Sequence, residues 1–172
     1  MYGFSTNAHT LDAQNAFERG LNASIPALAG ADELSGVGEM EAGVMGSFAQ
    51  MVLDNELAGS VLRLRKGLSA DVEHLAFDII GNVMNGTRNY LGQKHTLKHI
   101  RAGEMALTKL AERNSWDTWE EKLERRQMAD HAIDEAERIL RDHVVPPLEP
   151  QQEAELDKIL TAAEQETAKK KK

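Results

Sequence analysis

The sequence predicts a mostly α-helical chain whose first part also contains short β-structure. Nine of its 13 glycines lie in residues 1–70, whereas residues 71–172 are rich in charged side chains. Apolar residues recur at helical spacing along most of the chain, and capping residues stand where several of these runs begin. A short stretch between glycines, residues 33–37, is the best candidate for a β-strand. The change in composition near Ser69 indicates two parts, residues 1–68 and residues 69–172.

The first predicted helix follows Asp12, a good N-cap residue, and runs to about Ala29. Gly30 supplies the residue that ends it, and Pro26 inside it should produce a kink. Its apolar residues share one face: Phe17, Leu21, Ile25 and Leu28.

A glycine-rich loop, residues 36–46, leads to the second predicted helix. Ser47 and Gln50 have the spacing of a capping box, and Gly67 follows the last helical residue, Lys66. Apolar residues occur on more than one side of this helix, so it should be well buried: Phe48, Met51, Val52, Leu57, Val61 and Leu64.

The second part should be helical throughout. One apolar stripe runs from Val72 to Val83 and ends at Gly86, and residues 96–110 should hold another helix. Asp117 and Glu120 are spaced as a cap for a charged helix, with a possible break, that extends through Leu140. Two prolines at residues 146–147 end that helix, and Pro150 at a first helical position opens the last one.

Composition and charge exclude several classes of function. The net charge of −8 argues against a general nucleic-acid binder, which needs a basic face. The absence of cysteine excludes disulfides, cysteine-based metal sites and thiol nucleophiles. The longest uncharged runs, residues 20–31 and 42–53, are too short to span a bilayer, and residues 1–10 lack the pattern of a signal peptide. The sequence therefore predicts a cytoplasmic protein without nucleic-acid or membrane partners.

His95 and His99 are four residues apart, a spacing that places two imidazoles on one face of a helix. No third ligand is evident from the sequence, and Lys94 and Lys98 beside them would repel a cation. We therefore favour a pair of solvated histidines over a metal site and expect no metal.

Two carboxylates, Asp54 and Glu56, stand in an otherwise apolar part of the second helix. A carboxylate buried there would need a partner. It could belong to a structural ion pair or to an active site, and the sequence favours the structural role.

The first residues also combine chemistry that suits a small molecule. Tyr2 and Phe4 precede a polar run that ends at His9. Aromatic rings beside such groups are able to hold a quaternary ammonium ion, although many ordinary strand-to-helix loops have the same composition.

Several segments, in this order and spacing, resemble the trimethylamine methyltransferase family. They are residues 2–14 (YGFSTNAHTLDAQ), 25–31 (IPALAGA), 36–38 (GVG), 50–57 (QMVLDNEL), 90–92 (YLG), 95–99 (HTLKH), Trp119, and 142–148 (DHVVPPL). The resemblance covers nearly the whole chain but only the last third of the family's length.

The resemblance implies the C-terminal fragment of a TIM (β/α)8 barrel, followed by extra C-terminal helices. It also implies transfer of a methyl group from a methylated or quaternary amine to the Co(I) corrinoid of a partner protein, in the methylamine metabolism that supports methanogenesis. This chain would bind no cofactor itself, since the corrinoid (cobalamin) belongs to the partner. Two strand ends do not enclose a substrate, so we expect the chain to be inactive alone. The missing N-terminal barrel portion, or self-association, would cover its apolar helix faces.

The resemblance also implies which residues bind substrate. Those matching the end of the seventh strand and its following loop are Tyr2, Phe4, Ser5, His9, Asp12 and Gln14, and Glu39 matches the eighth loop. Ser5 stands where the trimethylamine-specific members carry pyrrolysine, which points to quaternary amines such as betaines. The alternative is a non-catalytic helical interaction protein derived from the barrel.

Overall fold

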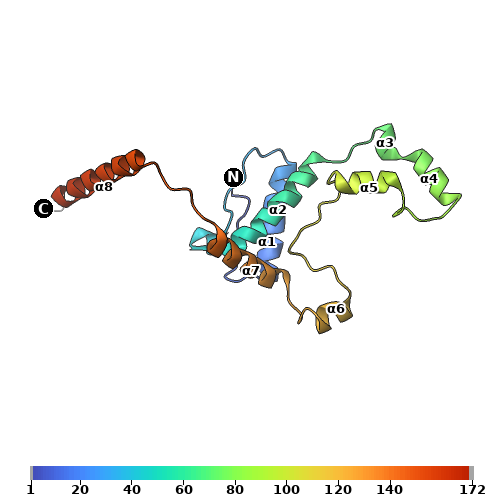
Figure 1. Ribbon diagram of the computed structural model, residues 1–172, viewed down its shortest axis with the longest axis horizontal. Helices are drawn as coiled ribbons and strands as arrows, with labels where there is room; N and C mark the ends of the chain where they lie inside the picture. The colour runs from blue at the N-terminus through green and yellow to red at the C-terminus, as the bar shows by residue number, and fades with distance from the viewer. Residues whose placement is uncertain (1, 171–172) are drawn as a thin grey trace. The chain divides into compact units, whose positions relative to one another are not determined.

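The computed structural model describes residues 2–170, and within them the chain is mostly helical (Figure 1). The first part holds α1 (Ala13–Leu28), β1 (Glu39–Met40), the 3-10 turn η1 (Glu41–Gly43), β2 (Met45–Gly46) and α2 (Phe48–Lys66). The second part holds α3 (Val72–Leu75), α4 (Phe77–Met84), α5 (Lys94–Arg101), α6 (Trp116–Glu121), α7 (Met128–Asp142) and α8 (Pro150–Lys170). The mainly helical class predicted from the sequence is confirmed.

The chain divides into two compact units, one ending at Arg138 and the other beginning at Ile139. The second unit contains the end of α7 and all of α8, whose residues 150–169 are exposed. Within residues 2–170, no helix combines the length and the apolar character that crossing a membrane requires.

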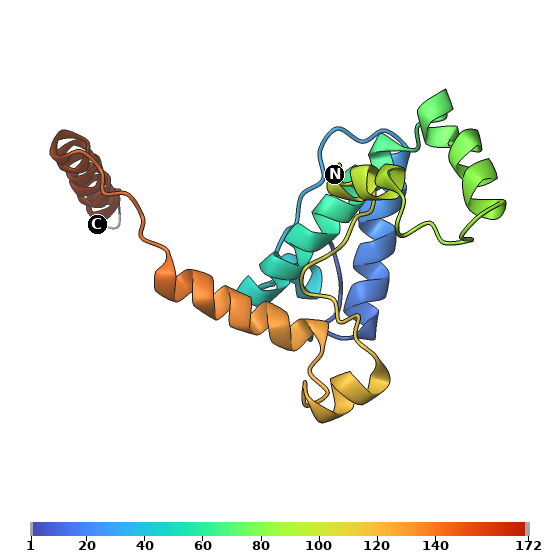
Figure 2. The ribbon, with the colours of Figure 1, turned by 45° about the vertical axis from the view of Figure 1, so that its right-hand side comes forward.

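Helices α1 and α2 lie side by side and enclose the hydrophobic core (Figures 1 and 2). The core consists of Phe4, Ala23, Ala27 and Val61, with Leu34, Leu57 and Ala58 packed against it. Both predicted caps are present: a carboxylate oxygen of Asp12 accepts from the Asn15 N–H, and the hydroxyl of Ser47 accepts from the Gln50 N–H. Gly30 and Gly67 follow the two helices with φ of 93° and 71°, in the region that favours glycine.

The buried face of α1 carries two polar side chains, Asn15 and Arg19, followed by two alanines, Ala23 and Ala27, at four-residue intervals. The apolar face is outside, and the exposed fractions are 68% for Phe17, 45% for Leu21, 60% for Ile25 and 60% for Leu28. Small side chains let two helices approach closely, so they occupy the contact and leave the larger side chains on the outer surface.

The prediction that α2 is well buried is wrong for this chain. Its buried residues are Gln50, Asp54 and Val61, whereas Phe48, Met51 and Leu64 are largely exposed. A single partner helix covers only one face of α2, and polar side chains fill much of that face.

The predicted strand at residues 33–37 is reduced to one parallel bridge, between Ser35 and Tyr2. Gly36 and Gly38 follow with φ of 95° and 80°, so the chain turns before a longer strand forms. The regular pairing lies in the next residues, where β1 and β2 form an antiparallel hairpin with Met40 opposite Met45.

The helices of the second part differ from the predicted ones in three places. The helix expected within residues 96–110 is α5, which ends at Arg101. The stripe from Val72 to Val83 is divided at Ala76, which adopts φ of 50° between α3 and α4. Ser115 caps α6 by accepting from the Thr118 N–H, so the predicted cap at Asp117 is wrong by two residues. The end of α7 at Asp142, before the two prolines, and the start of α8 at Pro150 agree with the sequence.

Candidate functional site

Two loop segments, residues 2–10 and residues 35–46, lie against each other at one end of the α1–α2 pair. We call them the first and second site loops. Backbone hydrogen bonds join them: Phe4 N to Ser35 O (2.9 Å), Glu41 N to Ala8 O (3.2 Å) and Ala42 N to Thr6 O (2.9 Å). Both loops precede a helix, so residues about 30 positions apart in sequence form one continuous surface.

A buried ion pair fixes both loops to the helices. Nη1 of Arg19 in α1 lies 2.6 Å from Oδ2 of Asp54 in α2, and the exposed fractions of the two side chains are 2% and 1%. Arg19 Nη1 also donates to the Phe4 carbonyl (2.6 Å), and Asp54 Oδ2 accepts from the Gly38 N–H (2.7 Å). Gln50 Nε2 donates to Asp54 Oδ1 (2.8 Å). Each charged group therefore joins a helix to one of the site loops.

Burial dominates the titration of this pair. It raises the pKa of the Asp54 carboxyl group, against the opposing effects of the Gly38 N–H, the Arg19 charge and the Gln50 amide. Burial also lowers the pKa of the Arg19 guanidinium, against the attraction of Asp54. The expectation that a buried Asp54 needs a partner is confirmed, and its contacts are those of a structural ion pair.

Glu18 in α1 organises the first site loop. Its Oε2 accepts from the Thr6 hydroxyl and from the Asn7 N–H, both at 2.7 Å, and its Oε1 accepts from Gln14 Nε2 at 2.9 Å. These hydrogen bonds, led by the one from Thr6, lower the pKa of the Glu18 carboxyl group. A carboxylate at neutral pH therefore underlies this loop.

The second site loop adds two further carboxylates. Oε1 of Glu41 lies 3.4 Å from Nε2 of His9, so the two loops also meet through side chains. Oε2 of Glu39 lies against Gly36 and Gly43, and both glycines have positive φ. The surface formed by the two loops is acidic, which suits a cationic ligand better than an anionic one.

The predicted binding residues lie within this region but have different surroundings. Tyr2 is exposed, Ser5 is half-buried with its carbonyl accepting from Asn22 Nδ2 (3.1 Å), and His9 is exposed beside Glu41. The Phe4 ring belongs to the hydrophobic core. Asp12 caps α1, Gln14 holds Glu18, and Glu39 lies in β1.

A cavity of about 460 Å³ lies beside the ion pair, between α1, α2 and the start of α7. Asp12 is the only predicted binding residue among those lining it, together with Asn15, Arg19 and Asp54 and with apolar residues such as Leu53 and Met128. The cavity is therefore next to the loop surface but is formed mainly by helix residues.

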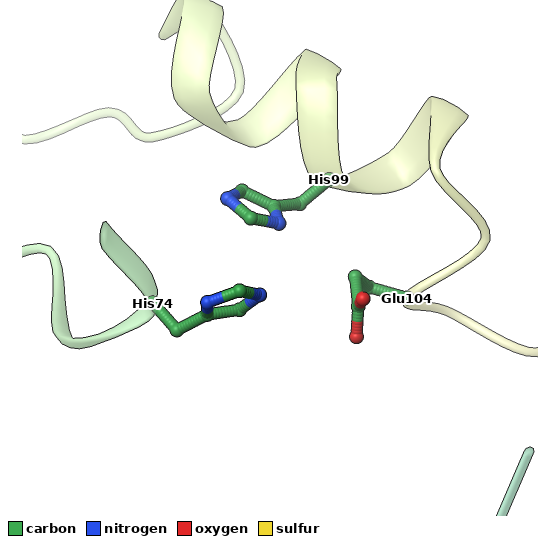
Figure 3. Close-up of side chains that lie close together, drawn as sticks. All are labelled: His74, His99 and Glu104. Carbon is green, nitrogen blue, oxygen red and sulfur yellow. The ribbon is translucent and has the colours of Figure 1, made fainter. Parts of the chain in front are cut away.

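His95 and His99 lie together on α5 as their spacing predicts, with ring centroids 4.3 Å apart, but His99 also has neighbours that the spacing does not predict. One ligand atom each of His74, His99 and Glu104 lie within 4.8 Å of one another, so a third ligand candidate is present (Figure 3). His95 is not in this group, and its Nε2 bonds the Glu73 carbonyl at 2.9 Å.

Sequence reasoning missed Arg19 and Glu18. A signal for Arg19 was available, because it precedes Ala23 and Ala27 at four-residue spacing, on a face of α1 that lacks large side chains. No sequence signal pointed to Glu18, because its partners Thr6 and Asn7 lie in a loop whose path the sequence does not specify.

Comparison with known proteins gives matches along nearly the whole chain. The sequence model of a family described as trimethylamine methyltransferase (MTTB) matches residues 2–168. A protein named glycine betaine methyltransferase from Desulfitobacterium hafniense is 34% identical over 156 residues, which are 90% of this chain and 32% of that protein. A trimethylamine methyltransferase MttB from the same species is 33% identical, over 90% of this chain and 30% of that protein.

A trimethylamine methyltransferase MttB from Methanosarcina barkeri is 29% identical over 147 residues, which are 86% of this chain and 29% of that protein. The chain thus spans about a third of the length of the relatives it matches.

Proposed function

Because this chain belongs to the trimethylamine methyltransferase family, we propose that it forms the C-terminal part of an amine methyltransferase. The enzyme would move a methyl group from a methylated or quaternary amine to the Co(I) corrinoid of a partner protein. The observation that carries this proposal is the family match over residues 2–168, which includes both site loops and the helices that hold them. The reduced cobalt supplies the nucleophile, so this chain need only bind and orient the methyl donor.

The two site loops have the chemistry that such a donor requires. Glu39 and Glu41 offer negative charge, and Tyr2 offers an exposed aromatic ring. Carboxylates and aromatic faces are the groups that attract a fixed positive charge on nitrogen. Ser5 has no group able to form a covalent adduct with an amine, so the proposed donor is a quaternary amine such as a betaine.

The loops also have the arrangement expected from a barrel. Tyr2 and Ser35 pair in parallel, as neighbouring strands of a (β/α)8 barrel do, and the residues after both positions lie together. Active sites of such barrels are built at the C-terminal ends of the strands. We therefore propose that residues 1–68 are the last two strand–helix units of a barrel and that residues 69–172 are added helices.

Two strand ends leave a bound donor open to water on most sides. The rest of the barrel would close the pocket by packing against the exposed apolar face of α1, which is formed by Phe17, Leu21, Ile25 and Leu28. Alone, the 172-residue chain would then not hold a methyl group in line with the cobalt.

The test combines the purified chain with a separately produced N-terminal barrel portion of a family member, a reduced corrinoid protein and a methyl donor. With glycine betaine as donor, we expect the corrinoid to be methylated in the combined sample, as measured by its absorbance. We expect no methylation with the chain alone. Methyl transfer by the isolated chain, or a combined sample that accepts only trimethylamine, would contradict the proposal.

The exposed face of α1 also favours a second candidate, a non-catalytic helical protein that binds a partner. The same experiment separates the two functions. A stable complex with the barrel portion that never methylates the corrinoid would support the binding protein, because the surface would be used without the chemistry.

A further inference from the structure

We propose that His74, His99 and Glu104 form a zinc site that joins α3, α5 and the segment after α5. Figure 3 shows the two imidazole rings one above the other and tilted, with the Glu104 carboxylate beside them. One ligand atom from each residue lies within 4.8 Å of the others. Small side-chain rotations would bring these atoms to the separation of ligands around one ion. The three residues are not adjacent in sequence, so the fold brings them together.

The hydrogen bonds of His74 leave the correct nitrogen for a metal. Its Nδ1 lies 2.8 Å from both carboxylate oxygens of Asp71, so the proton is held there and the lone pair is on Nε2. A carboxylate bonded to the far nitrogen of a histidine is the usual outer contact of a metal ligand.

His99 has a polar atom without a hydrogen bond. Its Nε2 is buried and makes none among the described residues, and Oε1 of Glu73 lies 3.7 Å away. Buried polar atoms are nearly always satisfied, so this nitrogen is available to bind a ligand. The ring centroids of His74 and His99 are 4.8 Å apart, so the unsatisfied imidazole belongs to the same cluster.

Glu104 is held in place from the other side. Arg63 of α2 binds both its backbone carbonyl (3.1 Å) and its carboxylate, and Lys66 Nζ lies 3.6 Å from Oε1. Each carboxylate oxygen keeps a further lone pair, so these contacts orient the group without using it up.

The charges around the cluster balance without an ion. The carboxylates are Asp71, Glu73 and Glu104, and the cations are Arg63, Lys66 and Lys98, with Lys98 paired to Glu73. Two neutral imidazoles and one carboxylate favour a borderline metal such as Zn²⁺ over Mg²⁺ or Ca²⁺, which prefer oxygen ligands. Solvent would supply the fourth ligand, since all three side chains are only partly buried.

The bound ion would be structural. The interactions between α3 and α5 include an ion pair at Lys98 and Glu73 and a hydrogen bond from His95 to the Glu73 carbonyl, both at exposed side chains. Exposed polar contacts contribute little to stability, so a metal ligated from three segments would fix this region more firmly.

The test uses the full chain without a histidine tag, stripped with chelator and then dialysed against a slight excess of Zn²⁺. We expect about one retained zinc per chain by atomic absorption and a visible spectrum of tetrahedral Co²⁺ when cobalt is substituted. His74→Gln, His99→Gln and Glu104→Gln should each lower zinc affinity by more than about tenfold, the minimum effect of altering an outer contact.

His95→Gln is the matched control. The His95 ring packs beside His99 on α5, with centroids 4.3 Å apart, but its Nε2 bonds a backbone carbonyl, so this variant tests whether any neighbouring imidazole would affect zinc. It should retain zinc as the wild type does.

Asp71→Asn tests the site even if a ligand variant fails to fold, because asparagine is also a good N-cap for α3. This variant should weaken zinc binding by about 10- to 100-fold. Failure of the wild type to retain zinc, equal retention by the folded ligand variants, or equal loss in His95→Gln would overturn the proposal.

Discussion

Arg19 and Asp54 form a buried ion pair in which each partner also holds the backbone of a different loop. Arg19 Nη1 donates to the Phe4 carbonyl and Asp54 Oδ2 accepts from the Gly38 N–H. The pair therefore connects four segments of the chain: both helices of the core and both site loops. Arg19 Nε and Nη2 are buried and make no hydrogen bond to any residue that the structure describes, which adds to the cost of leaving this charge uncompensated.

Removing one member of this pair should destabilise the chain strongly. Asp54→Asn leaves the Arg19 charge buried and unpaired, so we expect a loss of about 3–5 kcal/mol in the free energy of unfolding, measured with urea. The double variant Arg19→Met/Asp54→Asn should lower the free energy of unfolding by less than the sum of the two single variants, because neither charge is then buried without its partner.

Arg65→Ala is the control for this cycle, since Arg65 is exposed on the same helix as Asp54. It should change stability by at most about 0.5 kcal/mol. Strictly additive effects in the cycle would show that Arg19 and Asp54 are not energetically coupled.

Glu18 should give the fold a measurable dependence on acid. Hydrogen bonds lower its folded-state pKa below the ordinary value of 4.5, so the folded chain binds this proton less readily than the unfolded chain. The resulting stability is fully present above that ordinary value and is lost as pH falls through the folded-state pKa.

Glu18→Gln should accordingly be less stable than the wild type at neutral pH, and the difference should shrink as the pH falls from the ordinary value of 4.5 through the folded-state pKa. Urea midpoints measured across this range provide the check. Glu121→Gln, at an exposed residue of α6, should show no such convergence. A Glu18→Gln difference that stays constant in acid would mean that the Thr6 and Asn7 contacts do not depend on the charge.

Asp12 offers a test that separates stability from substrate binding. It caps α1, so Asp12→Ala should cost about 1 kcal/mol of stability, whereas Asp12→Asn should retain most of the cap. Thermal unfolding measures both. If Asp12 also binds the methyl donor, the Asp12→Asn variant should be stable yet bind the donor more weakly in the combined enzyme. Equal stability of the Asp12→Ala variant and the wild type would refute the capping role.

The apolar face of α1 should make the isolated chain self-associate or bind a hydrophobic dye. Phe17→Ser/Ile25→Ser should reduce dye fluorescence and shift the chain toward monomer, because both side chains are more than half exposed. Val44→Ser is the control, since Val44 is 81% exposed but lies in the second site loop. A dye-silent, monomeric wild type would show that this face needs no partner.

Ser5 should affect donor affinity without controlling the reaction. Ser5→Ala removes one hydroxyl from the first site loop, and the backbone carbonyl that Asn22 holds is unchanged. In the combined enzyme we expect a modest rise in KM for glycine betaine with kcat largely retained. Loss of all turnover would assign Ser5 a direct chemical role, against the proposed mechanism.

The sequence by itself determined most of the helices. The predicted caps at Asp12 and Ser47, the stops at Gly30 and Gly67 and the start of the last helix at Pro150 are all found in the structure. These features depend on interactions within a few residues, and local sequence specifies such interactions directly. Ser47 and Gln50 illustrate the limit, because Gln50 binds Asp54 rather than completing the capping box.

Only the tertiary structure decided which helix faces are buried and which side chains meet. The large apolar residues of α1, such as Phe17, lie outside while Arg19 and Ala23 lie inside, because the partner helix packs against the alanines and supplies Asp54 as the partner of Arg19. The Arg19–Asp54 pair joins residues 35 positions apart, and His74 meets His99 only because α4 and residues 85–93 return the chain to α3. Periodicity identifies the faces of a helix, but which face contacts another element depends on packing between distant segments.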